Sequence, residues 1–302
     1  MGPELRHLRY LIAVAEHGNF TRAAEELRIS QPTLSQQVKQ LERVVGAQLL
    51  DRSGRGVRLT DAGDAYVHYA RRALRDLAAA DRAVVDVADL SRGTLRLATT
   101  PTFTAYLVGP LVQELHTSHP GITLQLREMT QDRIEACLLA DEIDLGIAFE
   151  GPHPAGITAH ALFTETLSLV VTAHAPQAAT REPVPVSRLA EQHLALLSDD
   201  FATRGHIDSY FAAHHVEPPV AVEANSIQAL TEIVRRTPLL ATVLPDAVTD
   251  DHPHLTPVAL DPPLPARRVA LLRRDSAYRS AAARAFTRLA SRVVRDRGYT
   301  PA

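Results

Sequence analysis

Apolar side chains in the first sixty residues recur at the three- and four-residue steps of short helices. Residues 5–15, 20–27 and 34–45 each carry such a stripe, which predicts three helices. The turn between the second and third helices, residues 28–30, is very short. Two helices joined by so tight a turn predict a helix-turn-helix at about residues 20–39.

The third helix has clear start and stop signals. Ser30 suits the N-cap, Pro32 fits the first turn, where a missing N–H costs nothing, and Gly46 ends the helix. The side chains expected to face the core are Leu34, Val38, Leu41 and Val45. The opposite, polar face carries Pro32, Gln36, Lys39 and Arg43, with Ser35 and Gln40 beside them.

Beyond this helix the pattern predicts a small hairpin and then one long helix. Two short extended pieces flank the turn at residues 53–56, as in a wing. Residues 64–90 contain no proline and no glycine. Their apolar side chains alternate steps of four and three, the a/d seam of a coiled coil; a core helix of one domain is the alternative, but length and small alanines favour pairing with a second subunit. The seam consists of Tyr66, Ala70, Ala73, Leu77, Ala80, Val84 and Val87.

From residue 93 onward, expected strands alternate with expected helices. This order predicts a parallel sheet with right-handed crossovers. The strands are residues 95–98, 122–126 and 144–149, and the helices between them are 107–116 and 132–140. Further strands at 167–171, 194–197, 220–222 and 239–244 predict a second sheet, and 269–272 with a helix at 281–294 return to the first. Two lobes joined by crossing strands predict a hinged clamp with a cleft.

The stretch FTRAAEELRISQPTLSQQVKQLE, followed by GAQLLDRSGRGVRLTDAG, strongly resembles the amino-terminal signature of LysR-type transcriptional regulators. The resemblance covers the whole chain and implies an α+β protein. Its parts would be an all-α winged helix-turn-helix at 1–62, a linker and dimerisation helix at 63–90, and an α/β two-lobed effector-binding domain of the periplasmic-binding-protein type at 91–302. Lobe I would span about 91–164 and 267–302, and lobe II about 165–266.

Further segments are similar to regulators of cyanate-degradation operons within that family. They are AVAEHGNFTRAA, DRSGR, RLTDAG, TPTFTAYLVGPL, ITLQLREM, DEIDLGIAF, FATRGHID and EANSI, and they lie in both the head and the effector domain. The resemblance implies a cytoplasmic activator that responds to cyanate and acts as a homodimer or tetramer with RNA polymerase. Another small anion, an aromatic acid or an amino acid stays open as the effector.

The polar face of the third helix is suited to DNA. Glutamine side chains bridge the donor and acceptor edges of adenine, and lysine or arginine meets guanine or phosphate. Arg55, among glycines at the wing tip, can reach a narrow minor groove. A solvated polar surface is the alternative. The full set of DNA-binding candidates is Thr21, Arg22, Ser30, Gln31, Pro32, Thr33, Ser35, Gln36, Lys39, Arg43, Arg52, Arg55 and Arg58.

Effector-binding candidates follow the expected strands of both lobes. Hydroxyls and free N–H groups at helix starts suit a small anion, and the family resemblance implies a site between the lobes at such positions. Capping of the helices is the alternative role. The candidates are Thr100, Thr102, Thr130, Phe149, Phe201, Thr203, Asn225 and Ser226.

Composition and charge agree with a globular intracellular protein. The 302 residues are 45% apolar and 22% charged, and the net charge is −3. Residues 1–62 carry nine Lys and Arg against seven Asp and Glu, so a basic head joins an acidic body. The single Cys137 has no disulfide partner. We expect no secretory signal and no membrane span.

Enzyme and metal functions find little support in the sequence. It contains no GxSxG, GxGxxG or GxxxxGK[ST] motif. Its fourteen histidines lack the spacing of metal ligands, so we expect no metal and no cofactor beyond the effector. Cys137 is expected to be a buried, inert thiol rather than a redox sensor. A solute-binding protein is the rival that two lobes alone suggest, and the helix-turn-helix argues against it.

Overall fold

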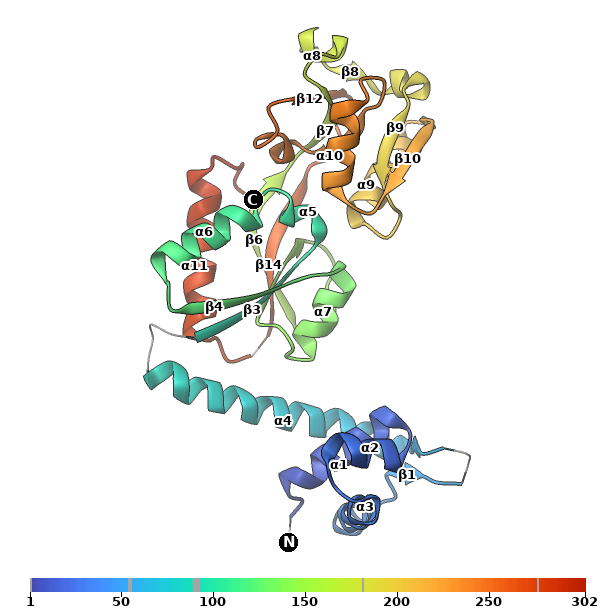
Figure 1. Ribbon diagram of the computed structural model, residues 1–302, viewed down its shortest axis with the longest axis vertical. Coiled ribbons are helices and arrows are strands. Elements are labelled where there is room, and N and C mark those ends of the chain that lie inside the picture. Colours follow the sequence, from blue (N-terminus) through green and yellow to red (C-terminus); the bar gives the residue numbers. More distant parts are fainter. Residues whose placement is uncertain (1, 54–55, 89–92, 181, 276) are drawn as a thin grey trace. The chain divides into compact units, whose positions relative to one another are not determined.

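The computed structural model describes residues 2–53, 56–88, 93–180, 182–275 and 277–302, with the backbone alone at 82, 83 and 85–88. The chain divides into two compact units, Met1–Val84 and Val85–Ala302 (Figure 1). The long helix therefore belongs mostly to the amino-terminal unit, the head. The expected boundary at residues 90 and 91 lies outside the described residues.

The head is a three-helix unit followed by a two-stranded wing. The short strands β1 and β2 pair antiparallel, which confirms the predicted hairpin. The elements are α1 Leu5–His17, α2 Phe20–Leu27, α3 Gln31–Val45, β1 Leu50–Asp51, β2 Arg58–Leu59 and α4 Asp61–Ala88.

Local capping fixes the helix ends where the sequence predicted them. Gly18 and Gly46 adopt the left-handed conformation after α1 and α3, with φ of 58° and 74°. The Asn19 side chain accepts from two backbone N–H groups of α2 and so caps the start of that helix. Ser30 accepts from the backbone N–H of Thr33 and starts α3.

The core of the head lies beneath α3. Leu34, Val38 and Leu41 are completely buried, as predicted, and Val45 is half-buried. Leu5 begins the predicted apolar stripe of residues 5–15 but is 46% exposed, whereas Leu11 and Val14 of α1 are completely buried. The face of α3 opposite this core is therefore free for a ligand.

Most of the predicted seam on α4 is open to solvent in the single chain. Ala73, Leu77, Ala80 and Val84 are exposed, with Leu77 at 44% and Val84 at 71%. Tyr66 instead packs, half-buried, against the core of the head, and Ala70 is buried. The side chain of Val87 lies outside the described residues.

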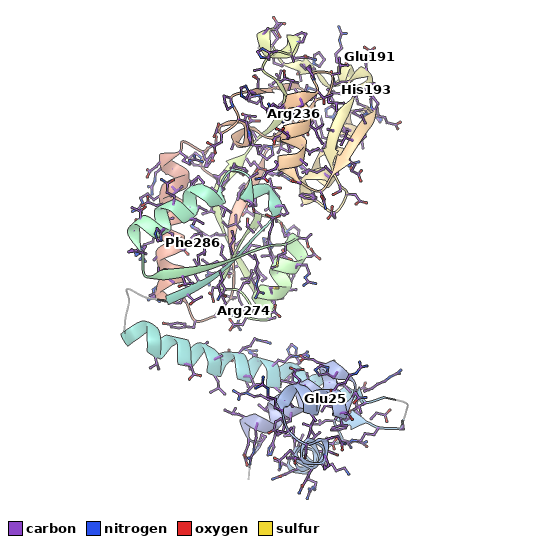
Figure 2. The ribbon with its side chains drawn as sticks, in the orientation of Figure 1. Glu25, Glu191, His193, Arg236, Arg274 and Phe286 are labelled. Atoms are coloured by element: carbon purple, nitrogen blue, oxygen red, sulfur yellow. The ribbon has the colours of Figure 1, made fainter. Side chains whose placement is uncertain are left out.

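Lobe I of the second unit is built on a five-stranded sheet of order β4-β3-β5-β14-β6. The first three run parallel, as predicted, and β14 pairs antiparallel with β5 and β6. Helices α6 and α11 cover one face, where Phe286 is fully buried, and α7 covers the other (Figures 1 and 2). Its elements are β3 Gly93–Thr99, α5 Pro101–Thr104, α6 Val108–Ser118, β4 Ile122–Glu128, α7 Gln131–Leu139, β5 Leu145–Phe149, β6 Ile157–Glu165, β14 Arg267–Arg274 and α11 Ala281–Asp296.

The sequence reading missed β6 altogether. This strand lies at the edge of the sheet, so its first half, residues 157–161, is only half-buried or exposed. Without a continuous apolar run it gives no strong strand signal.

Lobe II has a more divided sheet structure than predicted. Strands β11, β7 and β12 form one antiparallel sheet, while β9 and β10 pair separately and in parallel. A single bridge between Leu194 and Ala241 links the two. Its elements are β7 Leu167–Thr172, α8 Pro176–Thr180, β8 Val184–Pro185, η1 Val186–Glu191, β9 Leu194–Leu197, α9 Ala202–Ala213, β10 Val220–Ala224, α10 Ile227–Arg236, β11 Thr242–Pro245, η2 Asp246–Thr249, β12 Leu255–Val258 and β13 Leu260–Asp261.

The chain crosses between the lobes twice. It leaves lobe I where β6 ends at Glu165 and returns where β14 begins at Arg267. Both crossings place a charged side chain at the junction. Among the described residues, no helix combines the length and apolarity needed to cross a membrane.

Candidate effector site and DNA-binding surface

A cavity of about 470 Å³ lies between the two lobes, at the carboxyl ends of β3, β4, β5 and β9. Its volume falls within the range of small-molecule sites. Lobe I and lobe II both contribute to its wall, so closure of the lobes would change its shape. The lining residues are Thr100, Pro101, Thr102, Glu128, Met129, Thr130, Gln131, Asp132, Phe149, Asp199, Asp200, Phe201, Ala202, Gly205 and Asn225.

The structure brings six of the eight effector candidates to this cavity. Thr203 is fully buried behind the wall, and Ser226 caps α10 through the backbone N–H of Ala229. Neither of these two lines the cavity. The six that do are Thr100, Thr102, Thr130, Phe149, Phe201 and Asn225.

The buried floor of the cavity consists of Thr100, Thr102 and Phe149, which are 4%, 2% and 8% exposed. The Thr100 hydroxyl has no hydrogen-bond partner although it is buried. An unsatisfied buried hydroxyl is costly, at roughly 1–3 kcal/mol. A ligand that accepts from Thr100 would remove that cost.

A buried polar network runs behind the floor from one lobe to the other. The Thr102 and Thr203 hydroxyls lie 3.0 Å apart, and Arg267 donates to the Thr203 oxygen at 2.9 Å. Arg267 also donates to the Glu165 carboxylate at 2.7 Å, and Tyr106 donates to the same carboxylate at 2.5 Å. The network thus joins both crossing points of the chain to the cavity.

Arg267 also supports the aromatic part of the floor. Its guanidinium carbon lies 3.8 Å from the centre of the Phe149 ring, a cation–π contact. Burial, with the neighbouring Glu165 carboxylate, raises the pKa of Tyr106 well above its ordinary value. Tyr106 therefore keeps its proton and remains a donor to Glu165.

Gln131 is held in the cavity wall by two hydrogen bonds. Its Oε1 accepts from the backbone N–H of Phe149 at 3.1 Å, and its Nε2 donates to Glu135 at 3.3 Å. Glu135 in turn lies 2.8 Å from Nδ1 of His153. This chain of contacts fixes the start of α7 against the end of β5.

The sequence reading missed four carboxylates at the mouth of the cavity. Glu128, Asp132, Asp199 and Asp200 are all exposed, and we call them the carboxylate rim. The Thr130 hydroxyl donates to Asp132 and holds the pKa of that carboxyl below its usual range. Asp199 and Asp200 directly follow the buried strand β9, a strand-end position that could have identified them.

On the head, the structure exposes the polar face of α3 as predicted. Gln36, Lys39 and Arg43 are exposed there, while Ser35 is half-buried. Ser30 is occupied as the helix cap. The other exposed candidates are Thr21, Arg22, Gln31, Pro32, Thr33 and Arg58, and Arg55 lies outside the described residues.

Arg52 has a structural role that the sequence did not suggest. It donates to Glu42 at 2.9 Å and lies 5.7 Å from the centre of the Phe20 ring. Glu42 also accepts from the backbone N–H groups of Leu49 and Leu50. Glu42 and Arg52 therefore attach the wing to α3.

Cys137 and the histidines form no evident reactive centre. Cys137 is 7% exposed, and burial together with Glu142 raises the pKa of its thiol. Within the described ranges, no three His, Cys, Asp or Glu side chains gather as they would around a metal ion.

Comparison with known families agrees with this geometry. Residues 5–64 match the bacterial regulatory helix-turn-helix protein of the lysR family, and residues 88–295 match the LysR substrate binding domain. The chain belongs to the LysR family of transcriptional regulators. As a member of that family it is a DNA-binding regulator with an effector-binding domain.

Individual LysR-family proteins show the extent of the likeness. The nitrogen assimilation regulatory protein nac of Klebsiella aerogenes is 34% identical over 244 residues, which cover 80% of this chain and 78% of that protein. Full-length OxyR C199D from Pseudomonas aeruginosa is 26% identical, with a TM-score of 0.68 and coverage of 96% and 94%. Full-length CbnR complexed with its target DNA is 25% identical, with a TM-score of 0.63 and coverage of 96% and 99%.

Proposed function

We propose that this LysR-family regulator changes its contacts with promoter DNA when a small molecule binds in the interlobe cavity. The observation that carries the proposal is the buried, unpartnered Thr100 hydroxyl in the floor of that cavity. A ligand that bridges the lobes shifts the balance between open and closed forms only through its differential affinity for them. The network from Thr102 to Glu165 connects the cavity to both crossing points.

The DNA-binding part of the proposal rests on the exposed face of α3. Gln36 and Lys39 are free to reach base edges and phosphates, and Glu42 holds the wing beside the helix. The CbnR structure contains target DNA, which supports the same use of this fold here. We further propose that the protein acts in the cytoplasm as a homodimer or tetramer, joined through the exposed seam on α4, and activates transcription through RNA polymerase.

Cyanate is the finer proposal for the effector, with a cyanate-degradation operon as the target. It rests on the sequence segments quoted above. Three heavy atoms at about 1.5 kcal/mol each allow at most roughly 4–5 kcal/mol, which corresponds to sub-millimolar or millimolar binding. The nac and OxyR proteins are not cyanate regulators by name, and the carboxylate rim opposes an anion. Cyanate therefore needs a direct test.

A mobility-shift assay with the DNA upstream of the gene tests the proposed function. The wild-type protein should bind that DNA, and millimolar cyanate or another small metabolite should change the complex. Thr100→Val keeps the side-chain shape but removes the hydroxyl, so it should abolish the response and leave DNA binding intact. The matched control is Thr117→Val on the exposed surface of α6, which should respond like the wild type. A protein whose DNA complex no metabolite alters would contradict the proposal.

A further inference from the structure

The charge of the interlobe cavity differs from what an anionic effector requires. Four carboxylates surround its mouth, and no Lys, Arg or His is among the described residues that line it. Like charges around one opening add to a common negative potential, which repels anions and attracts cations. The sequence resemblance predicted a simple anion as the effector, and the negative potential at the mouth of the cavity disfavours the binding of such a ligand.

Among the nearby positive groups, Arg133 of α7 lies close enough to Asp132 to help lower the pKa of that carboxyl, whereas Arg204 and Arg267 have carboxylate partners of their own. Arg204 in α9 lies 2.9 Å from Asp208 and 3.1 Å from Glu223. Arg267, behind Phe149, is paired with Glu165 at 2.7 Å. In contrast, within the described part of the chain none of the four rim carboxylates forms an ion pair.

The floor of the same cavity has the opposite preference. The Thr100 hydroxyl is unpartnered, and the longer helices α7 and α9 begin at the wall without a side-chain cap at Thr130 and Phe201. In α7 the N–H groups of Asp132 and Arg133 bond the Asp132 carboxylate, so the donors that still lack an acceptor are the first N–H groups of α9. An acceptor group on the ligand, such as a carboxylate, would satisfy them.

We infer that the effector is a small molecule with a positively charged nitrogen at one end and a hydrogen-bond acceptor at the other, as in an amino acid. The acceptor lies on the floor at Thr100, and the cationic group lies among the rim carboxylates, Asp199 and Asp200 from lobe II facing Glu128 and Asp132 from lobe I. A cation between carboxylates of both lobes stabilises their approach. This inference rests on the proposed function and names the ligand class of the same cavity.

Three flexible probes of similar length and one small anion test the charge preference in the full-length protein. L-Lysine has both a carboxylate and ammonium groups, cadaverine has ammonium groups alone, and glutarate has carboxylates alone; cyanate is the fourth probe. Each probe is added at about 10 mM, at a constant ionic strength of about 0.1 M so that the screening of charges is the same. We expect lysine to raise the melting temperature of the protein most, cadaverine to raise it less, and glutarate and cyanate to leave it unchanged.

Two variants assign that preference to the rim and the floor. Asp199→Asn with Asp200→Asn should weaken lysine binding at least about tenfold, measured by calorimetry, because it halves the rim charge. The control Glu217→Gln removes an exposed carboxylate outside the cavity and should leave binding unchanged. Thr100→Val should weaken lysine but not cadaverine, since only lysine has an acceptor for the floor.

The outcomes separate this inference from the proposed function. Glutarate or cyanate binding more tightly than the amines would overturn the charge assignment, and loss of that binding in Thr100→Val would show that the cavity still serves an anion. Equal changes in melting temperature with all four probes, or no change with any of them, would also overturn the inference. The proposed function fails only if no small molecule changes the DNA complex.

Discussion

The reading face of α3 and the interlobe cavity are assembled in opposite ways. The face of α3 comes from one helix whose spacing separates buried leucines from exposed Gln36, Lys39 and Arg43. The cavity draws its wall from segments more than a hundred residues apart, among them Thr100 and Phe201. The two sites also differ in charge, because the helix presents cations and the cavity mouth presents carboxylates. A local pattern thus specifies the DNA surface, whereas the fold specifies the cavity.

The largest effect is expected where the head depends on a second chain. Leu77→Asp should leave the single chain folded, since Leu77 is 44% exposed there. In the paired seam, a charge at a core position is expensive: even a neutral polar group buried without a partner costs roughly 2–7 kcal/mol. Analytical ultracentrifugation should therefore show a shift toward monomer, with weaker binding to a two-fold operator.

Arg72→Asp is the control for this variant, because Arg72 is exposed and lies away from the seam on α4. It should self-associate like the wild type. A Leu77→Asp protein that remained fully dimeric would show that another surface makes the main interface.

The second-largest effect is expected in the buried ion pair behind the floor of the cavity. Glu165→Ala leaves the Arg267 guanidinium, 10% exposed, without its carboxylate, and breaking a buried ion pair in this way costs about 3–5 kcal/mol. The adjacent Arg268, 59% exposed, pairs with Glu150 at 3.1 Å, and Arg268→Ala should cost about 0–1 kcal/mol. Urea unfolding followed separately in the two units would measure both.

The loss should be confined to the effector domain, and the head should unfold as in the wild type. Equal effects of the two substitutions would mean that the network behind the floor does not stabilise the junction. That outcome would also remove the link between the cavity and the crossing strands.

A third, smaller effect distinguishes two roles on the same helix. Gln36→Ala should cost roughly 1–3 kcal/mol of specific binding and relax preference at one base position. Lys39→Ala should weaken binding to operator and random DNA alike and reduce the salt slope by about 1. Fluorescence anisotropy across a salt series tests both, with Gln113→Ala on α6 as the control. If both variants weaken operator and random DNA equally, Gln36 does not read a base.

The sequence predicted the α3 surface better than the cavity, because α3 is specified by a local pattern and the cavity by the fold. Periodicity and capping residues such as Ser30 and Gly46 define α3 locally, so its ends and buried face were predicted correctly. The edge strand β6 was missed, because its first half has no continuous apolar run and it pairs with β14, which is distant in sequence. The same limit applied to the cavity: Thr100 and Thr130 were found from strand ends, but the convergence of Glu128 and Asp199 is visible only in the fold.

The smallest effect concerns Cys137, which lies on α7 beyond the residues that line the cavity. If the effector domain responds through its cavity, this thiol should be a bystander. Its thiol donates to Glu142 at 3.4 Å, and burial followed by that carboxylate raises its pKa. Only the thiolate reacts, so a raised pKa lowers reactivity at neutral pH.

We expect iodoacetamide to alkylate Cys137 about tenfold or more slowly than a free thiol at pH 7.5, by mass spectrometry, with reactivity rising as pH passes above the ordinary value of about 8.5. Unfolding the protein in urea should restore the ordinary rate. Glu142→Gln should accelerate the reaction in the folded protein, because it removes a negative charge that disfavours the thiolate. Fast alkylation at neutral pH, or loss of DNA binding on mild peroxide treatment, would instead place a redox response at Cys137. The effector domain would then have a second sensor that acts independently of the cavity.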